Sequence, residues 1–359
     1  MYFYFFGASF ILTLILTPLI KRLALKLDIV DLPKLKRKIH KKSTPLLGGL
    51  AIFITIFLIV FLFFKTDFWP QGEISLKNII GLFMGGVILM IGGFFDDKYD
   101  LKPSQQIIWP ILAAIFVIIS GVGIEFINNP FGEGYIFFNN TKIELLRIKG
   151  IPYYFTPLAD MITFLWLIVL MYATKLLDGL DGLVSGLTCI GALTIAGLCL
   201  LTIFHLPNLG FLSLIVAGAF LGFLIYNFQP AKIFLGEGGS LFAGFILGCL
   251  AILSGSKLAT TFLIAGLAIF DIFGVFFKRI LKGKSPFKGD KSHLHFRLLR
   301  LGMSKKKAVI IYWILALIFG FSALFLQTIG KVIAIILLFV IFIILGIFLP
   351  IKTKDSGND

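Results

Sequence analysis

Apolar runs long enough to cross a lipid bilayer recur along the whole length of this 359-residue chain. A helix needs about 20 consecutive apolar residues to span a hydrocarbon core of about 30 Å. Hydrophobic residues make up 58% of the chain and the mean hydropathy is +1.02, far above the values of a soluble domain. Because the runs follow one another from end to end, no soluble domain fits between them. We therefore predict a single domain over residues 1–359, an all-α polytopic membrane protein.

The apolar runs predict about eleven transmembrane helices. Their approximate extents are 2–20, 46–64, 78–95, 107–127, 158–175, 183–204, 211–227, 238–254, 258–277, 308–327 and 332–350. The first run has no Lys or Arg before it and is followed by Lys21, Arg22 and Lys26, which is not the order of a cleaved signal peptide. We therefore expect it to remain as a span, with the N-terminus outside the cell.

The formal net charge of +15 is distributed as membrane topology requires. The predicted cytoplasmic loops are 21–45, 96–106, 175–182, 228–237 and 278–307. With the C-terminal tail, they carry 26 of the 33 Lys and Arg residues. This positive-inside distribution predicts a cytoplasmic C-terminus. The basic loops are expected to touch anionic lipid head groups, and no sequence motif supports binding to nucleic acid.

The longest outward loop, 128–157, carries two short runs rich in β-branched and aromatic residues. Tyr135–Phe138 and Ile143–Ile148, with Asn139-Asn140 between them at the start of the turn, predict a small outward β-hairpin. Nothing in this loop predicts catalysis.

Two pairs of carboxylates lie at the cytoplasmic ends of predicted spans. Asp96-Asp97 ends the third span, and Asp178-Gly-Leu-Asp181 joins the fifth and sixth spans. Asp178 and Asp181 are one helical turn apart and could share a helical face. Adjacent acids raise one another's pKa unless a cation lies between them. Both pairs therefore favour a divalent metal site, although solvated loop acids would give the same sequence.

Three further loops carry groups that can hold phosphate. Gly236-Glu237-Gly238-Gly239 opens a span, where backbone N–H groups attract anions, although small residues also pack helices together in membranes. Lys41 precedes the segment Pro45-x-x-Gly48-Gly49. His293 and His295 would face the same way on an extended segment, and with many bases nearby they favour phosphate or sugar contact over metal. A basic loop that rests on lipid is the simpler alternative for the Lys41 and histidine segments.

All these motifs fall on one side of a topology that was derived from Lys and Arg counts alone. Lys41, the Asp96 and Asp178 pairs, Glu237 and the histidine segment share the predicted cytoplasmic face. Unrelated structural features would not be expected to agree in this way. Carboxylates for Mg²⁺ together with bases for phosphates describe a site for a soluble diphosphate and a lipid substrate.

Together the motifs resemble those of the polyprenyl-phosphate N-acetylhexosamine-1-phosphate transferases, most closely the bacterial undecaprenyl-phosphate GlcNAc-1-phosphate transferases that start cell-surface glycan synthesis. The matching segments are Pro45-x-x-Gly48-Gly49, Phe95-Asp96-Asp97, Asp178-Gly-x-Asp181-Gly, Tyr226-Asn227-x-x-Pro230-Ala231-Lys232-Ile233-Phe234, and Ser285-Pro286-Phe287 followed by His293-x-His295. The resemblance implies that the phosphate of undecaprenyl phosphate attacks the β-phosphorus of a UDP-N-acetylhexosamine and releases UMP. It also implies Mg²⁺ as cofactor, with Mn²⁺ as an alternative, and a site on the cytoplasmic face of the bacterial inner membrane. A homodimer is left open.

The resemblance also implies roles for individual residues. The catalytic carboxylates are Asp96, Asp97, Asp178 and Asp181, with Asp96 as the acid that deprotonates or orients the lipid phosphate. The metal ligands are Asp97, Asp181 and Glu237. The substrate-binding residues are Lys41, Lys175, Leu180, Asn227, Phe234, His293, His295 and Arg297. Among these, Phe234 is placed to stack on uracil, and the two histidines with Arg297 match the segment that holds phosphate and the amino sugar.

Three residues depart from the family's pattern. Family members usually have Asn where Lys175 stands, Asp where Glu237 stands and His where Phe296 stands. Glu237 keeps the charge but is one methylene longer. Lys175 adds a positive charge beside the expected metal site, which either weakens Mg²⁺ binding or takes over a phosphate contact.

Two other functions fit part of the pattern. Asp96-Asp97-x-x-Asp100 and Asp178-x-x-Asp181 also look like the Asp-rich motifs with which intramembrane prenyltransferases hold Mg²⁺ and a prenyl diphosphate, but the glycine-rich turn and the histidines have no role there. A non-catalytic lipid transporter would line a path with acids at mid-membrane, where only Asp271 lies.

Overall fold

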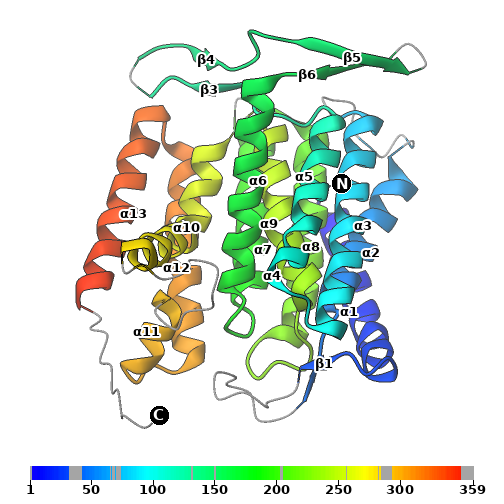
Figure 1. Cartoon of the computed structure of the whole chain (residues 1–359), viewed down its shortest axis with the longest axis vertical. Coiled ribbons are helices and arrows are strands. Elements are labelled where there is room, and N and C mark those ends of the chain that lie inside the picture. The colour runs from blue at the N-terminus through cyan, green and yellow to red at the C-terminus, as the bar shows by residue number, and fades with distance from the viewer. Residues whose placement is uncertain are drawn as a thin grey trace.

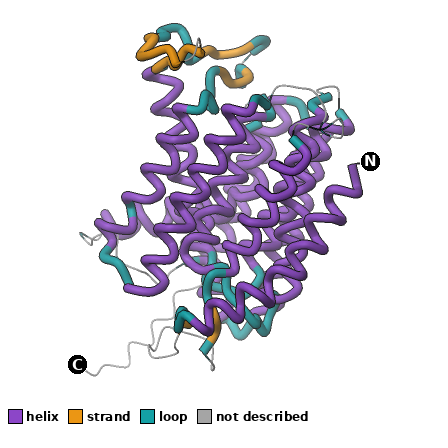
Figure 2. Tube along the Cα trace, turned by 90° about the vertical axis from the view of Figure 1, so that its right-hand side faces the viewer, coloured by secondary structure: helices purple, strands orange, loops and turns teal. Residues whose placement is uncertain are grey.

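A computed structural model gives the fold of this chain. It describes residues 2–31, 43–64, 66, 69, 74–130, 132–148, 151–202, 205–255, 257–281, 283 and 293–348. Lys41 and the segment Ser285-Pro286-Phe287 lie outside these residues. The described part is mostly helical, and its long helices run side by side as a bundle (Figures 1 and 2).

Nine helices of the described residues are long and apolar enough to cross a membrane. They are α1 (Tyr2–Lys26), α3 (Leu76–Tyr99), α6 (Pro157–Leu177), α7 (Leu183–Leu201), α8 (Pro207–Asn227), α9 (Gly236–Leu253), α10 (Leu258–Leu281), α12 (Lys305–Phe325) and α13 (Thr328–Phe348). Two shorter apolar segments join the bundle, namely α2 (Gly48–Phe63) and the consecutive α4 (Pro103–Gln106) and α5 (Ile108–Ile119). The chain is therefore a multi-pass membrane protein. Each predicted span overlaps one of these segments, but only nine of the described helices have the full length for a crossing, so the predicted number of about eleven transmembrane helices is not confirmed.

The limits of one predicted span differ clearly from the structure. Helix α5 ends at Ile119, Gly121 has a φ of 83°, and Phe126 begins a strand, so the span predicted at 107–127 extends too far. The reason is that an apolar run does not by itself distinguish a helix from a strand. The structure also adds a short helix, α11 (Leu294–Arg300), inside the predicted loop 278–307.

The strands of the described residues form three antiparallel pairs. They are β1 (Val30–Asp31) with β2 (Thr44–Pro45), β3 (Phe126–Asn128) with β4 (Tyr135–Phe137), and β5 (Ile143–Ile148) with β6 (Ile151–Phe155). The predicted pairing of 135–138 with 143–148 is therefore wrong, because each run pairs with a different neighbour. Gly134, with a φ of 86°, lies in the turn that joins β3 to β4. Only two residues separate β5 from β6, which is a common hairpin length.

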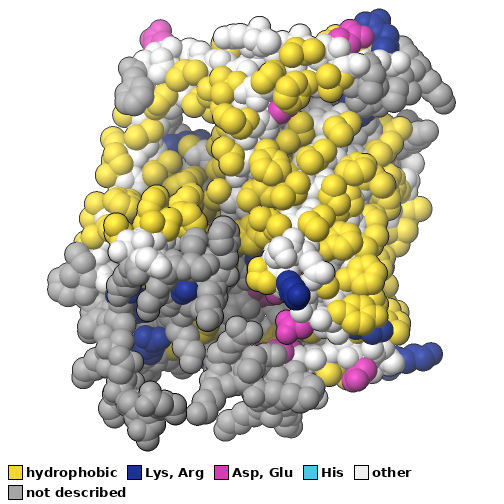
Figure 3. Space-filling model, in the orientation of Figure 1, with side chains coloured by type: hydrophobic (Ala, Val, Ile, Leu, Met, Phe, Trp, Pro, Cys, Tyr) yellow, Lys and Arg dark blue, Asp and Glu magenta, His cyan; other side chains and the backbone are white. Residues whose placement is uncertain are grey.

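Helices α7, α8 and α9 form the centre of the bundle. In the most apolar window of α9, 89% of the residues are buried inside the protein, against 11% for α13. The outer helices expose large apolar side chains such as Phe3, Leu165 and Ile336. Figure 3 shows hydrophobic side chains as a broad band on one face of the molecule, between charged groups at the two ends. Such a band is what contact with lipid requires.

Two glycine contacts bring α2, α3 and α9 together. A Cβ atom at Gly93 of α3 would lie 2.1 Å from the backbone N of Gly238 on α9, and a Cβ atom at Gly49 of α2 would lie 2.2 Å from Cα of Gly239. Neither side chain could be accommodated, so the backbones approach this closely only because both partners are glycines. These contacts set the C-terminal end of α3 beside the N-terminal end of α9.

The two ends of the bundle differ in structure. The hairpins β3–β4 and β5–β6 lie at one end, and the β1–β2 pair lies at the other (Figure 1). Helix α6 follows β6 directly, so its C-terminal turn lies at the end opposite the hairpins. That opposite end holds the acids described next.

Candidate active site

The five acids singled out from the sequence come from three parts of the bundle. Asp96 and Asp97 lie in the last turn of α3, Asp178 and Asp181 lie between α6 and α7, and Glu237 lies in the first turn of α9. We call these five residues the acidic cluster. The structure brings them together at the end of the bundle away from the hairpins.

Asp97 is held at the N-terminus of α9. Its two carboxylate oxygens accept hydrogen bonds from the backbone N–H of Glu237, at 3.1 and 3.2 Å. The positive end of the helix dipole favours a carboxylate in this place. A Cβ atom at Gly236 would lie 2.5 Å from Asp97 Oδ2, so the glycine leaves the room that this carboxylate occupies.

Asp178 and Asp181 lie in a turn and not on a helix. Helix α6 ends at Leu177, α7 begins at Leu183, and Gly182 has a φ of 83°. The two acids therefore do not share a helical face, because the glycine-containing turn ends one helix before the next begins.

The turn holds the two acids in different surroundings. Asp181 Oδ2 accepts a hydrogen bond from the backbone N–H of Ala231, at 3.1 Å. Burial, together with the negative charges of Glu237, Asp181 and Asp97, raises the pKa of Asp178 well above its usual range. The acidic cluster is thus crowded enough that its members oppose one another's ionisation.

Lys175, in the last turn of α6, lies among the acids. Its Nζ is 2.9 Å from Glu237 Oε2 and 3.9 Å from Asp96 Oδ2. It also donates a hydrogen bond to Oε1 of Gln106, at 3.0 Å. The Lys175 side chain is 14% exposed. The lysine therefore does not turn away from the acids, and its contacts in the structure are with the chain itself.

Asp96 is buried, and it is fixed by groups that follow it in the chain. Its Oδ1 accepts hydrogen bonds from the N–H of Leu101 and from Nε2 of Gln106, both at 3.0 Å. Gln106 thereby links Asp96 to Lys175. Sequence reasoning missed Gln106, because a single neutral amide at the start of an apolar run carries no distinguishing signal.

Asn227 ties the α6–α7 turn to the loop before α9. Its Oδ1 accepts hydrogen bonds from the N–H of Gly182 at 3.1 Å and from Oγ of Ser185 at 2.8 Å, and its Nδ2 donates to the carbonyl of Ile233 at 3.0 Å. Asn227 and Leu180 are both almost completely buried. These two predicted substrate-binding residues thus shape the site from inside the fold.

The Pro45-x-x-Gly48-Gly49 segment packs against the residues before α9. The N–H of Gly48 donates to the carbonyl of Phe234 at 2.9 Å, and the N–H of Gly49 donates to the carbonyl of Leu235 at 2.8 Å. In return, the N–H of Phe234 donates to the carbonyl of Pro45 at 2.9 Å. The structure therefore sets this segment beside Phe234, whereas Lys41 lies outside the described residues.

His293 is held by a carboxylate from α10. Its Nδ1 is 3.0 Å from Asp271 Oδ2, and the N–H of Leu294 donates to Asp271 Oδ1 at 2.8 Å. Both side chains are buried. The sequence marks Asp271 as a charge at membrane depth, and such a charge needs partners. Which partners it has could not be read from the sequence, because the contact depends on how the chain returns to α10.

His293 and His295 lie at the start of α11 and not on an extended segment. Their rings nevertheless stack, with centroids 5.8 Å apart and planes 10° apart. His295 is 1% exposed, and neither of its ring nitrogens has a hydrogen-bond partner among the described residues. A Cβ atom at Gly179 would lie 2.9 Å from His295 Nε2, so the imidazole rests against the α6–α7 turn. A buried polar group without a partner is costly and points to a ligand.

Arg297, the third member of the predicted basic segment, contacts a different helix. Its Nη2 donates a hydrogen bond to the carbonyl of Gly346 on α13. The structure thus directs the guanidinium toward α13.

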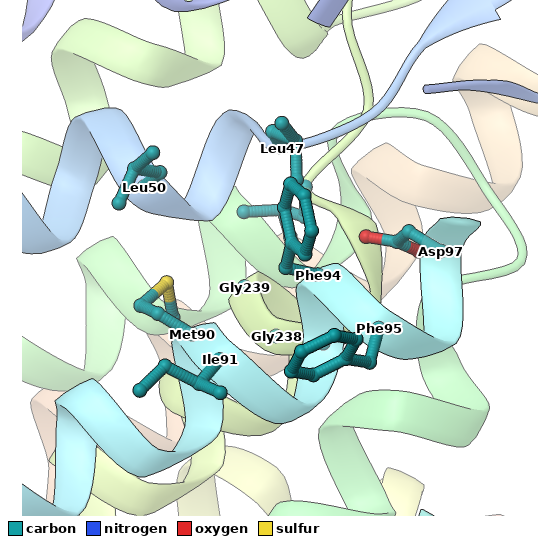
Figure 4. A pocket seen from close by; sticks show the side chains of 11 residues that line it. Leu47, Leu50, Met90, Ile91, Phe94, Phe95, Asp97, Gly238 and Gly239 are labelled. Carbon is teal, nitrogen blue, oxygen red and sulfur yellow. The ribbon is translucent and has the colours of Figure 1, made fainter. Parts of the chain in front are cut away.

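An apolar groove leads to the acidic cluster. Its volume is about 310 Å³, and it is lined by Leu47, Leu50, Met90, Ile91, Gly93, Phe94, Phe95, Asp97, Leu235, Gly238 and Gly239. Figure 4 shows apolar side chains along this groove, with Asp97 at one end. Ile91 and Phe95 are exposed, so the groove opens on the outer surface of α3. This arrangement suits a ligand with a long apolar chain and a charged head group.

The acidic cluster suits a divalent cation that is shared with a ligand. Within the described residues, no three His, Cys, Asp or Glu side chains are arranged closely enough to hold a metal ion by themselves. Mg²⁺ commonly keeps several waters and binds one or two carboxylates together with substrate phosphates, so it does not need such a group. A cation would also relieve the crowding that raises the pKa of Asp178. One or two carboxylates of the acidic cluster could therefore hold Mg²⁺ together with a substrate phosphate.

The chain is similar to known membrane transferases along most of its length. Residues 79–255 match the family model of glycosyl transferase family 4. The chain is 34% identical to the probable undecaprenyl-phosphate N-acetylglucosaminyl 1-phosphate transferase of Bacillus subtilis, over 98% of this chain and 91% of that protein. It is 27% identical to the decaprenyl-phosphate N-acetylglucosaminephosphotransferase of Mycobacterium leprae, over 87% and 80% of the two chains. It is 30% identical to the phospho-N-acetylmuramoyl-pentapeptide-transferase of Leptospira biflexa, over 79% and 80%.

The multi-pass helical fold, the acidic cluster and the apolar groove define an integral-membrane transferase that acts on a lipid. The chain belongs to glycosyl transferase family 4, among the polyprenyl-phosphate N-acetylhexosamine-1-phosphate transferases. The resemblance drawn from the sequence motifs is thereby confirmed. None of these relatives supports an intramembrane prenyltransferase or a non-catalytic transporter.

Acid is expected to destabilise the fold through His295. Burial lowers the pKa of its imidazole from 6.5 to about 4. Stability that is present above pH 6.5 is therefore lost as the pH falls toward 4, by at most about 3 kcal/mol. Thermal unfolding between pH 7.5 and 4.5 should show a smaller loss of Tm for His295→Gln than for the wild type.

The exposed His205 provides the matched control for this measurement. His205→Asn should follow the wild-type pH profile, since Asn tolerates the positive φ of 40° at this position. An equal loss of Tm in His295→Gln and the wild type would show that His295 does not titrate in this range.

Proposed function

We propose that this chain transfers an N-acetylhexosamine 1-phosphate, GlcNAc 1-phosphate in the first instance, from a UDP-sugar to undecaprenyl phosphate and releases UMP. The observation that carries the proposal is the meeting of the apolar groove with the acidic cluster at Asp97. A prenyl chain in the groove would leave its phosphate beside the acids. Undecaprenyl and decaprenyl phosphate in the names of the relatives support this acceptor. We propose that the reaction is the first membrane step of cell-surface glycan synthesis.

In the proposed reaction, a phosphate oxygen of the lipid forms a bond to the β-phosphorus of the UDP-sugar. The bond from that phosphorus to the bridging oxygen breaks, and UMP leaves with the electron pair. Asp97, Asp181 and Glu237 would hold Mg²⁺ or Mn²⁺, which when bound neutralises charge on the pyrophosphate. Asp96 would orient or deprotonate the lipid phosphate, and Asp178 completes the set of catalytic carboxylates.

The remaining predicted residues are proposed to bind the UDP-sugar. Phe234 would stack on uracil, with Lys41, Leu180 and Asp181 as further members of the nucleoside pocket. Asn227 is the other predicted substrate-binding residue of this part of the chain. The two partnerless ring nitrogens of His295 support a hydrogen bond to a sugar or phosphate oxygen. His293, held by Asp271, and Arg297 would act from the same segment.

Location and partners follow from the topology predicted from charge. We propose that the protein lies in the bacterial inner membrane, with the N-terminus outside, the C-terminus in the cytoplasm and the acidic cluster at the cytoplasmic face. Its partners would be the UDP-N-acetylhexosamine, undecaprenyl phosphate and the surrounding lipids, with no nucleic acid. The whole chain would act as one domain, as a monomer or a homodimer.

Purified protein should release UMP from UDP-GlcNAc when undecaprenyl phosphate and Mg²⁺ are present. Excess EDTA should abolish this release, because the carboxylates and the pyrophosphate are all negatively charged and repel one another without a cation. Added Mg²⁺ or Mn²⁺ should restore it. A panel of UDP-sugars in the same assay identifies the donor. Full turnover in EDTA would exclude the proposed metal. Diphosphate release from a prenyl diphosphate would indicate a prenyltransferase, and no reaction with either substrate would favour a transporter.

Asp97→Asn and Asp181→Asn should each lower kcat/KM for UMP release by about 100-fold or more, because each removes charge that stabilises the transition state. Asp100→Asn is the matched control, since Asp100 is an exposed member of the same acidic run with a φ of 51° that Asn tolerates. It should retain nearly full activity. Near-normal rates in both cluster variants would return these acids to the class of solvated loop charges.

The proposed topology can be tested by thiol labelling in intact cells. The three native cysteines are buried, so a cysteine introduced at an exposed position should dominate the labelling. Tyr135→Cys on β4 should react with a membrane-impermeant reagent, whereas Ser104→Cys on α4 should react only after the cells are permeabilised. The reverse pattern would refute the orientation derived from the Lys and Arg counts.

A further inference from the structure

Two of the three departures from the family's pattern touch each other. Lys175 and Glu237 come from different helices, α6 and α9, and the structure sets Lys175 Nζ 2.9 Å from Glu237 Oε2. The longer side chain of Glu237 and the cation at position 175 thus form one ion pair.

The Lys175 ammonium group contacts side chains from three helices. An ammonium carries three N–H donors. Glu237 Oε2 and Gln106 Oε1 lie at 2.9 and 3.0 Å, and Asp96 Oδ2 lies at 3.9 Å on the same nitrogen. These three groups come from α9, α4 and α3. The lysine therefore joins groups from three helices, with two close contacts and one longer ion pair.

The charge of Lys175 falls where the surrounding negative charge is greatest. The acidic cluster holds five carboxylates, and two of them contact this one ammonium group. Carboxylates brought together in a partly buried place repel one another unless a cation lies among them. Lys175 also lies in the last turn of α6, where the helix dipole favours a cation.

We infer that Lys175 is an internal counter-ion that holds Asp96 and Glu237 in place when no divalent metal is bound. It is a positioning residue, because it acts through the acids that it contacts. Without it, the ends of α3 and α9 would repel each other in the metal-free protein. With it, the cluster stays assembled between turnovers, and the metal has less negative charge to neutralise.

This role rests on the proposed function only in that the divalent metal is the cation that Lys175 replaces. Its test therefore measures thermal unfolding and no catalysis. Thermal unfolding is measured in EDTA and over a series of Mg²⁺ concentrations, without substrate. The proteins compared are the wild type, Lys175→Gln, and the double variant Lys175→Gln with Glu237→Gln. If the transferase assignment failed, the comparison in EDTA would be unaffected.

Lys175→Gln should lower Tm in EDTA by about 3 °C or more, since it leaves two acids without their cation. Adding Glu237→Gln should recover at least half of that loss, because one of the two unneutralised acids is then gone. Mg²⁺ should raise the Tm of Lys175→Gln by more than that of the wild type, with half of the rise reached at a severalfold lower concentration.

Lys98→Gln is the matched control. Lys98 also lies at the end of α3, but it is exposed. Its Nζ lies 5.8 and 5.7 Å from the ring centroids of Phe94 and Tyr99. Its Tm should equal that of the wild type in EDTA and respond equally to Mg²⁺.

Two results would overturn the inference. The first is a Tm of Lys175→Gln in EDTA that equals that of the wild type. The second is a loss that the added Glu237→Gln does not relieve, which would mark Lys175 as a packing residue. If Lys175→Gln cannot be isolated in either buffer, recovery of a folded double variant still supports the ion pair, and failure of the double variant counts against it.

Discussion

The structure depends on keeping several carboxylates together at the edge of a membrane. Such groups repel one another and lose hydration when they are buried, so each needs a compensating partner. The chain supplies these partners from its own backbone and side chains. The N–H of Glu237 donates a hydrogen bond to Asp97, and the N–H of Ala231 donates one to Asp181. Lys175 forms ion pairs with Glu237 and Asp96. The tight glycine contacts between α2, α3 and α9 are what allow these groups to meet.

The fold could be predicted from the sequence where hydropathy alone decides it. Apolar length identified every long helix, because lipid leaves a spanning segment no alternative to internal hydrogen bonding. It failed where apolar residues leave the membrane, as in the strand that begins at Phe126. The predicted pairing of β4 with β5 also failed, because each of these strands pairs with a strand outside the two runs, β4 with β3 and β5 with β6. Helix α11 is too short and too basic to show a periodic signal.

The members of the site could be predicted from residue type and sidedness, but their contacts could not. A cluster of acids, a glycine-rich helix start and two histidines are visible in the sequence. That Asp271 would hold His293, or that Gln106 would join Asp96 to Lys175, depends on how distant helices pack. The same limit applies to Asn227, which the motif marks as important and the structure explains as a clamp between two loops.

The opening of the apolar groove on the outer surface of α3 determines how a lipid acceptor would reach the site. A prenyl chain that enters there arrives by lateral diffusion and never passes through water. Occupancy of the groove is then governed by the mole fraction of the acceptor in the surrounding lipid, and not by its molarity in the solution. In detergent, added micelles act as a diluent for the acceptor but not for a sugar nucleotide. The two substrates of one reaction would thus come from different phases, the lipid acceptor from the two-dimensional membrane and the sugar nucleotide from the solution.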